Sequence, residues 1–410
     1  MRRRWTSIGL GALLAAGFAA PAPAAGPTAT ASALGREMRF AGASSSALVV
    51  DVNTGETLYA RRAAASRVPA SVNKLHTTAA ALVRLGPDAT LSTDLLVGAP
   101  AVDGMIPGDV YLRGGGDFTF GPRQARRLAE ALVDSGVRTV RGRVIGDERL
   151  FDTLRGPPSA NFQTSPWVGP LSALSYDRGM SGRSWPRFQS RPALFAAQRF
   201  ERTLRRAGVS VRRDARTGTA PASAQLVLRA PSVPLSSLLA TINQPSDNFG
   251  AEMLLKQLGA RFAGSGSTTR GAVVVGEAMG ELGVSARVVD GSGLSRSNRT
   301  TATEVVTLLS AMDAGPDGPA FERSLPVAGR SGTLRRRMRG TTAEGRCRAK
   351  TGTLTGVSAL AGYCDAPSGR LAFAFLMNGV DVTAARSRQD RMTATLAAYQ
   401  SAGTVTTARR

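Results

Sequence analysis

Histidine is nearly absent from this chain of 410 residues, in which His76 is the only one. A Ser-His-Asp triad needs a histidine that faces the nucleophile. His76 follows Lys74 by two positions, and in the helix that we expect there these two side chains point to different faces. A triad is therefore disfavoured, and a serine paired with a lysine base is favoured by elimination.

Lysine is almost as scarce. Of the 52 Lys and Arg residues, only Lys74, Lys256 and Lys350 are lysines. Arginine keeps its proton in proteins and cannot act as a base, whereas a desolvated lysine can lose its proton. Two of the three lysines fall within motifs described below. This favours a chemical role over a coding bias that left three lysines by chance.

Aromatic residues make up only 5% of the chain, although its formal net charge is +23. A nucleic-acid binder would combine basic patches with aromatic side chains that stack on bases. Here the arginines are spread without a stacking pattern, and the densest run, residues 335–339, is typical of a solvated face. We therefore expect no nucleic-acid partner and attribute the charge to attraction toward an anionic cell envelope.

Only two cysteines are present, Cys347 and Cys364. They lie at equal distances from the centre of residues 354–357, where we expect a turn between two strands. This arrangement predicts a cross-strand disulfide, which is worth about 3 kcal/mol in the chain-entropy model. Two buried thiols in adjacent strands are the alternative. A disulfide is typical of a compartment outside the cytoplasm.

Long apolar runs are missing, apart from a short one near the N-terminus. Arginines at positions 2–4 are followed by an apolar run over about residues 8–20 and by small residues suited to signal cleavage. The run is too short to span a membrane comfortably, and no cysteine follows it to carry a lipid. We predict that residues 1–25 are a signal peptide and that the mature protein is periplasmic or otherwise extracytoplasmic, without a transmembrane anchor.

The order of expected elements indicates an α/β (α+β) fold. Strands are expected at residues 46–50 and 56–60, and the helix that carries Ser71 should end at Gly86. Residues 26–37 are small and polar and predict a flexible lead-in. Further elements are expected toward the C-terminus: helices at 235–242, 248–258, 272–282, 302–312 and 384–399, and strands at 345–353, 357–365 and 371–378.

Residues 90–228 differ in texture, because short apolar runs are split there by Gly, Pro and Arg clusters. The Gly-Gly-Gly-Asp run at 114–117 could suggest a phosphate cradle. No Lys-Ser/Thr follows it, so a turn after a strand is expected. We predict a main domain from residues 26–90 and 229–410, interrupted by a strand-rich inserted domain at residues 91–228.

Three short motifs occur in order along the chain: Ser71-Val72-Asn73-Lys74, Ser246-Asp247-Asn248 and Lys350-Thr351-Gly352. Each alone is common, as a solvated helix pair, a turn or a strand segment. Together, at a helix start, in a loop between helices and on a strand, they are typical of class A β-lactamases and penicillin-binding proteins. The trio therefore predicts an acyl-transferring serine enzyme.

Each motif residue has a chemical task in such an enzyme. Ser71 attacks a carbonyl carbon and becomes acylated, and Lys74 accepts its proton when burial keeps the amine neutral. Ser246 is placed to relay that proton to the leaving amine. Asn248 offers an amide to the substrate backbone and to Lys74.

The third motif is expected to bind the substrate. Lys350 keeps the site electropositive and, with Thr351, suits a substrate carboxylate. Gly352 lets a substrate strand approach the sheet edge. The backbone amides of Ser71 and Thr353 are the natural donors to the oxyanion. No cofactor and no metal is expected.

The chain resembles the D-Ala-D-Ala carboxypeptidase/endopeptidases, the class C low-molecular-mass penicillin-binding proteins. Beyond the trio, the resemblance rests on residues 111–117, 142–147, 170–174, 290–296, 325–334 and 349–363. It implies a serine β-lactamase/transpeptidase-like domain with an antiparallel sheet flanked by helices. Ser71 and Ser246 are 175 residues apart (246 − 71), which is shorter than in the larger family members.

The resemblance also implies the partners. These are peptidoglycan stem peptides ending in D-Ala-D-Ala, and β-lactam antibiotics that acylate Ser71. Asp147 resembles an acidic position associated with recognition of the peptide's side-chain amine, although an acidic turn residue is the alternative. Two other functions stay open: a β-lactamase-like hydrolase or esterase, and a non-catalytic penicillin-binding envelope protein.

Overall fold

The computed structural model describes residues 26–182 and 187–401. The predicted signal peptide lies outside the described residues and stays a prediction. Among the residues that are described, no helix combines the length and the apolar character needed to cross a lipid bilayer.

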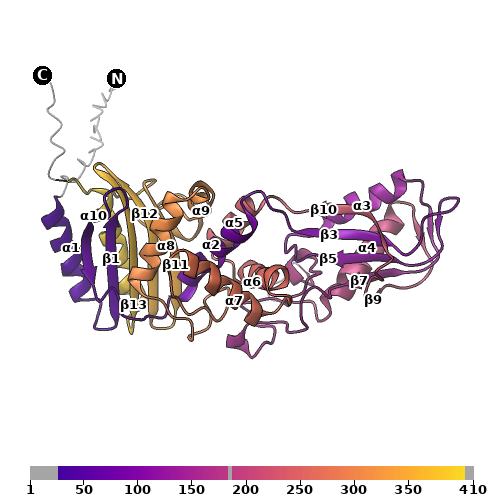
Figure 1. The fold of residues 1–410 in the computed structure, drawn as a ribbon, viewed down its shortest axis with the longest axis horizontal. Helices are drawn as coiled ribbons and strands as arrows, with labels where there is room; N and C mark the ends of the chain where they lie inside the picture. Colours follow the sequence, from indigo (N-terminus) through magenta and orange to yellow (C-terminus); the bar gives the residue numbers. More distant parts are fainter. Residues whose placement is uncertain (1–25, 183–186, 402–410) are drawn as a thin grey trace, which may run out of the picture.

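The main sheet joins the two ends of the chain (Figure 1). It has five antiparallel strands in the order β11-β12-β13-β1-β2. Their bounds are β1 Ser45–Asp51, β2 Thr57–Arg61, β11 Cys347–Leu354, β12 Val357–Ala366 and β13 Gly369–Asn378. Each was expected from the sequence to within three residues at either end.

Alternate residues of the central strand β13 enter two different cores. Phe373 and Phe375 pack with helices α1 (Pro27–Arg39) and α10 (Val382–Ala397) on one face of the sheet. Ala372 and Ala374 pack with the helices of the opposite face. This period-2 alternation is what a strand buried on both faces requires.

The opposite face is covered by six helices, which Figure 1 shows between the sheet and the rest of the molecule. They are α2 Lys74–Leu85, α5 Leu235–Asn243, α6 Asn248–Phe262, α7 Thr268–Glu281, α8 Ala302–Ala314 and α9 Gly318–Arg323. Helix α2 ends at Gly86, as predicted, because this residue takes a φ of 80° that favours glycine.

The predicted flexible lead-in at residues 26–37 is wrong, because helix α1 occupies this stretch. Its buried residues, Thr30, Leu34 and Met38, are four apart and so share one helix face. Small and polar neighbours hide this sparse pattern in the sequence. Packing against α10 and β2 stabilises the helix.

The predicted disulfide between Cys347 and Cys364 is confirmed. The two residues are direct partners in the antiparallel register of β11 and β12, with a Cα–Cα distance of 4.1 Å. The turn expected at residues 354–357 joins these strands.

Residues 92–231 form the remaining strands and a separate hydrophobic core. One five-stranded sheet has the order β10-β3-β5-β7-β9, and a three-stranded sheet has the order β4-β6-β8. The strands are β3 Ser92–Val97, β4 Met105–Ile106, β5 Val110–Gly114, β6 Thr139–Val140, β7 Val144–Asp147, β8 Ser210–Val211, β9 Arg216–Thr217 and β10 Gln225–Pro231.

Two helices in this region, α3 (Pro122–Asp134) and α4 (Pro192–Arg206), were not expected from the sequence. Their buried residues have helical spacing, as in Ala125, Leu128 and Leu132 of α3. Arginines fill the exposed positions and make the stretches appear irregular when they are read for continuous apolar runs. The region thus contains two helices beside the strands of its two sheets.

Candidate active site

Ser71 and Lys74 lie one above the other at the start of the helical layer. Residues Ala70–Asn73 form a 3-10 turn that leads into α2 at Lys74. In a 3-10 turn, side chains three residues apart eclipse each other. The Lys74 amine accordingly donates a hydrogen bond of 3.0 Å to the Ser71 hydroxyl.

Lys74 is fully buried, and its amine reaches three oxygen atoms. Besides Ser71 Oγ, these are Asn248 Oδ1 at 2.8 Å and the carbonyl oxygen of Ser292 at 2.6 Å. Burial lowers the pKa of Lys74 from 10.5 to about 8. The negative charges of Asp247, Asp290 and Glu252 act in the other direction and raise this pKa, but burial has the larger effect. A substantial neutral fraction near pH 8 gives this amine the capacity to accept a proton from Ser71.

The Ser246-Asp247-Asn248 motif forms the tight connection between α5 and α6. Ser246 takes a left-handed φ of 61°. Asp247 caps α6 by accepting a hydrogen bond of 2.8 Å from the Gly250 amide. The turn therefore places Ser246 and Asn248 on either side of the cap, where Asn248 contacts Lys74 at the start of α2 and Ser246 contacts Lys350 of β11.

Lys350 on β11 is also fully buried. Its amine donates 2.8 Å hydrogen bonds to Ser246 Oγ and to the Thr351 carbonyl oxygen. Burial, together with the positive charge of Lys74, holds the pKa of Lys350 well below its usual value. The two amines thus reach the two serines, Lys74 to Ser71 and Lys350 to Ser246.

Gly352 is required where β11 passes the turn that carries Ser71. A Cβ atom at this position would lie 2.6 Å from the Pro69 carbonyl oxygen and 3.1 Å from the Ser71 nitrogen. The glycine was expected to admit a substrate strand. In the structure Gly352 admits the turn that carries Ser71, so that this turn and the sheet edge come into contact.

The three motifs meet in one cleft of about 570 Å³. Ser71, Ser246, Asn248, Thr351 and Thr353 line it, while the two lysines lie beneath its surface. A cleft of this size is typical of small-molecule and peptide sites. Its polar groups converge on Ser71.

The chain matches the model of the D-Ala-D-Ala carboxypeptidase 3 (S13) family over residues 29–187 and 181–399. The chain belongs to this family. The family predicted from the motifs is therefore confirmed. The predicted activity, that of a serine-type D-Ala-D-Ala carboxypeptidase, is confirmed with it.

Curated S13 relatives extend over most of the chain. A D-alanyl-D-alanine carboxypeptidase of Actinomadura sp. is 35% identical, covering 87% of this chain and 82% of the relative. Carboxypeptidase DacB of Mycolicibacterium smegmatis is 34% identical, covering 85% of this chain and 79% of the relative.

A solved structure has the same fold. Penicillin binding protein 4 (dacB) of Haemophilus influenzae superposes with a TM-score of 0.75 at 20% identity, covering 88% of this chain and 98% of that one. The predicted fold class, an α/β (α+β) fold with an antiparallel sheet flanked by helices, is therefore confirmed.

Several S13 cleft residues were not predicted from the sequence. Arg386 of α10 donates a 2.9 Å hydrogen bond to Thr353 Oγ1, and Thr333 lies 2.8 Å from Thr351 through their hydroxyls. Trp167 has 70% of its surface exposed at the rim, and its carbonyl oxygen accepts from Asn248 Nδ2 at 3.3 Å. Thr333 lies within residues 325–334, which carry part of the resemblance, but nothing local marked it as a cleft residue. Arg386 and Trp167 belong to no local motif.

A buried acidic pair lies behind Lys74 and was also missed as part of the site. Glu252 and Asp290 are both fully buried. Glu252 Oε1 accepts a 2.8 Å hydrogen bond from the amide of Ser292, the residue whose carbonyl oxygen binds Lys74. Burial and the charge of Asp290 raise the pKa of Glu252 from 4.5 to about 7.

Asp147 is not brought to the cleft. It is fully buried on β7, where its oxygens accept hydrogen bonds from the amides of Arg149 and Ala220, at 3.0 and 2.9 Å. Arg149 also pairs with it at 3.4 Å. These contacts fit a residue that holds neighbouring loops, and the geometry offers no support for its predicted contact with substrate.

The histidine His76 and the third lysine, Lys256, do not line the cleft. Both have structural environments of their own. Burial lowers the pKa of His76 to about 4, which leaves the ring neutral. Lys256 of α6 is buried against Asp152 in an ion pair of 2.5 Å.

Proposed function

We propose that this protein releases the terminal D-alanine of peptidoglycan stem peptides through an acyl-enzyme on Ser71. The observation that carries the proposal is the contact of 3.0 Å between Ser71 Oγ and the fully buried Lys74 amine, at the base of the cleft. The chemistry is acyl transfer in two steps.

In the first step, Ser71 Oγ attacks the carbonyl carbon of the penultimate D-alanine, and its proton passes to the neutral Lys74 amine. The negative charge on the carbonyl oxygen is stabilised by the amides of Ser71 and Thr353. The C–N bond then breaks, and the departing D-alanine amine takes up a proton through Ser246. Ser246 suits this relay because its hydroxyl accepts from Lys350 at 2.8 Å.

In the second step, a water molecule attacks the ester carbon. The water gives up a proton to the Lys74 amine, which passes it to Ser71 Oγ as the C–O bond breaks. The shortened peptide then leaves with a new carboxylate, and the Ser71 hydroxyl is restored. Asn248 supports both steps by holding Lys74 at 2.8 Å. The Asn248 side-chain amide donates one hydrogen to the Trp167 carbonyl oxygen and would donate the other to bound substrate.

The terminal carboxylate of the substrate is assigned to the Thr351, Thr353 and Arg386 side of the cleft. These residues line it together. The Arg386 guanidinium already donates to Thr353 Oγ1, and guanidinium groups match carboxylates in charge and shape. Thr353 and Arg386 would therefore share the carboxylate.

The same acyl step accounts for inhibition by β-lactams and for cleavage of peptide cross-links, in which the leaving amine belongs to a second stem peptide. Solved structures similar in fold include penicillin binding protein 4 of Haemophilus influenzae in complex with a β-lactam. A predatory peptidoglycan endopeptidase of Bdellovibrio bacteriovorus also has this fold, with a TM-score of 0.52 at 19% identity. Similarity at these identities concerns the fold alone.

The experiment combines a fluorescent penicillin with two substrates. The parent protein is expected to be labelled, to lose the label slowly and to release D-alanine from a soluble pentapeptide. Ser71→Ala should fold and remain unlabelled. Mass spectrometry of products from intact peptidoglycan reports cross-link cleavage. Labelling of Ser71→Ala would move the nucleophile elsewhere, and rapid turnover of penicillin would favour a β-lactamase.

We also propose the setting in which this reaction takes place. Residues 1–25 would direct export, and the enzyme would act outside the cytoplasm. Residues 26–90 and 229–410 would form the catalytic domain, with residues 91–228 as an inserted domain. The separate hydrophobic core of the latter supports this division. N-terminal sequencing of the exported protein tests the cleavage site.

A further inference from the structure

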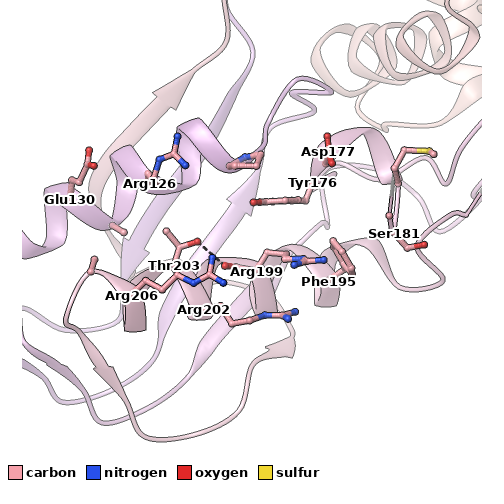
Figure 2. A pocket seen from close by; sticks show the side chains of 15 residues that line it. Arg126, Glu130, Tyr176, Asp177, Ser181, Phe195, Arg199, Arg202, Thr203 and Arg206 are labelled. Atoms are coloured by element: carbon pink, nitrogen blue, oxygen red, sulfur yellow. Dashed lines mark hydrogen bonds between the residues drawn. The ribbon is translucent and has the colours of Figure 1, made fainter. Parts of the chain in front are cut away.

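A second cavity of about 700 Å³ lies in the region of α3 and α4 (Figure 2). It shares none of its lining residues with the cleft that contains Ser71. Figure 1 shows α3 and α4 at the end of the molecule opposite the main sheet. The cavity therefore has no part in the acyl-transfer chemistry.

The wall formed by α4 carries a row of cationic side chains. Arg199, Arg202 and Arg206 line the cavity and are three and four residues apart, so they lie along one face of the helix. Arg126 of α3 lines the cavity from the other helix. From Arg199 to Arg206 the helix rises about 10 Å.

Within the described part of the chain, residues 26–182 and 187–401, these four arginines have no anionic partner in an ion pair. The cavity has only two acidic lining residues in that part of the chain, Glu130 and Asp177, against four arginines. By contrast, Arg205 on a neighbouring face of α4 pairs with Glu201 at 2.8 Å. Like charges at helical spacing repel, so the row costs stability that a bound anion would restore.

Aromatic side chains form the adjoining part of the cavity. Phe195, one turn before Arg199, and the buried Tyr176 meet edge to face, with ring centroids 6.2 Å apart. The Arg199 guanidinium lies over the Phe195 ring at 4.7 Å, and its Nε is buried without a hydrogen-bond partner in the described part of the chain. Figure 2 shows Tyr176 and Phe195 at one end of the arginine row.

We propose that this cavity binds a linear anionic polymer of the cell envelope. Its repeated phosphate or carboxylate groups would lie along Arg126, Arg199, Arg202 and Arg206, and a sugar ring of a polymer that carries one would pack against Phe195. Arginine forms paired hydrogen bonds with either anion, and a row about 10 Å long suits a chain that carries several charges better than a single ion. An aromatic ring offers an apolar surface to the face of a sugar.

The site would hold the enzyme on an anionic polymer while the distant cleft works on stem peptides. Binding does not depend on Ser71. A small soluble peptide does not need this anchor, so its hydrolysis reports the catalytic site alone. Loss of polymer binding and loss of catalysis are therefore separable.

The experiment measures binding of the full-length mature protein to two polymers. One is poly(glycerol phosphate), which carries phosphates, and the other is polygalacturonate, which carries carboxylates on sugar rings. Neutral dextran and phosphatidylglycerol vesicles are the comparison ligands. The test variant is Arg202→Gln with Arg206→Gln. The matched control is Arg123→Gln with Arg127→Gln, two exposed arginines of α3 that do not line the cavity.

The test variant should bind the preferred polymer about tenfold or more weakly, while the control stays within about twofold of the parent. Both should release D-alanine from a soluble pentapeptide at the parent rate. Phe195→Leu should weaken binding to polygalacturonate. Preference for either polymer supports the site and names its anion. Equal loss in both double variants, preference for vesicles, or no binding by the parent would overturn it.

Discussion

The Lys74 amine has no exposed surface and lies 3.0 Å from the Ser71 hydroxyl. This pairing depends on a 3-10 turn that eclipses the two side chains and on Asn248 and Ser292, which hold the amine from the other side. Burial at this position lowers the pKa of the amine to about 8, so that Lys74 can lose and regain its proton near that pH. The predictions below test this arrangement and the elements that support it.

The rate of acylation should depend on the protonation state of Lys74. Because the pKa is about 8, the neutral fraction of the amine rises about tenfold with each unit by which pH increases toward 8. The rate of penicillin labelling should therefore rise up to about pH 8 and then level off. Lys74→Arg should reduce labelling by a factor of about 100 or more at every pH, since arginine keeps its proton. Normal labelling by Lys74→Arg would refute the role of the base.

Glu252 should couple folding stability to pH. Its folded-state pKa of about 7 lies above the ordinary 4.5, so the folded state retains a proton that the unfolded state loses. The stability from this group is present below about pH 4.5 and is lost as pH rises through 7. Glu252→Gln keeps an acceptor for Ser292 and removes the titration.

Between pH 5 and pH 8, the free energy of unfolding of the parent, measured in urea, should fall by at most about 3 kcal/mol more than that of Glu252→Gln. Glu277→Gln, at an exposed glutamate of α7, is the control and should follow the parent. A parallel pH dependence in all three proteins would contradict the prediction.

Arg386 should contribute to substrate affinity more than to turnover. Arg386→Gln removes a guanidinium beside Thr353, so KM for a pentapeptide should rise by roughly tenfold while kcat changes less. Arg336→Gln makes the same charge change at an exposed residue outside the cleft and should leave KM unchanged. A change in kcat alone would place Arg386 outside carboxylate binding.

Gly352→Ala should impair both folding and acylation. The new methyl group would lie 2.6 Å from the Pro69 carbonyl oxygen, so either β11 or the Ser71 turn must shift. Overpacking of this kind costs about 1–3 kcal/mol. Gly276→Ala in α7, where nothing lies within 4 Å of the new Cβ, should be neutral or slightly stabilising. Urea unfolding and penicillin labelling of both variants measure the difference.

Removal of the disulfide should lower stability with little effect on the active-site geometry. Cys347 and Cys364 lie at the end of the strand pair remote from its turn. The change Cys347→Ala with Cys364→Ala should reduce the free energy of unfolding by about 3 kcal/mol and retain penicillin labelling. A thiol reductant should have no effect on this variant but should destabilise the parent. Unchanged stability in the parent after reduction would contradict the prediction.

Local sequence determined much of this protein. The strands β1, β11, β12 and β13, the glycine that ends α2 and the three motif segments follow from patterns only a few residues long. Such patterns depend on local backbone dihedral angles and on the spacing of side chains along the chain. Both can be read directly from the order of residues. The scarcity of histidine and lysine also favoured a pairing of Ser71 with Lys74, and these side chains lie 3.0 Å apart.

Tertiary structure alone decided what these segments meet. Arg386 gains its role because α10 packs beside β11, and Glu252 because α6 places it against the Ser292 peptide. Helix α1 exists because three widely spaced side chains find a core. Burial, not residue type, lowers the pKa of Lys74. The packing of α3 beside α4 brings arginines of both helices to one cavity. Contacts between distant segments set solvent exposure and local charge, and no stretch of sequence read alone contains them.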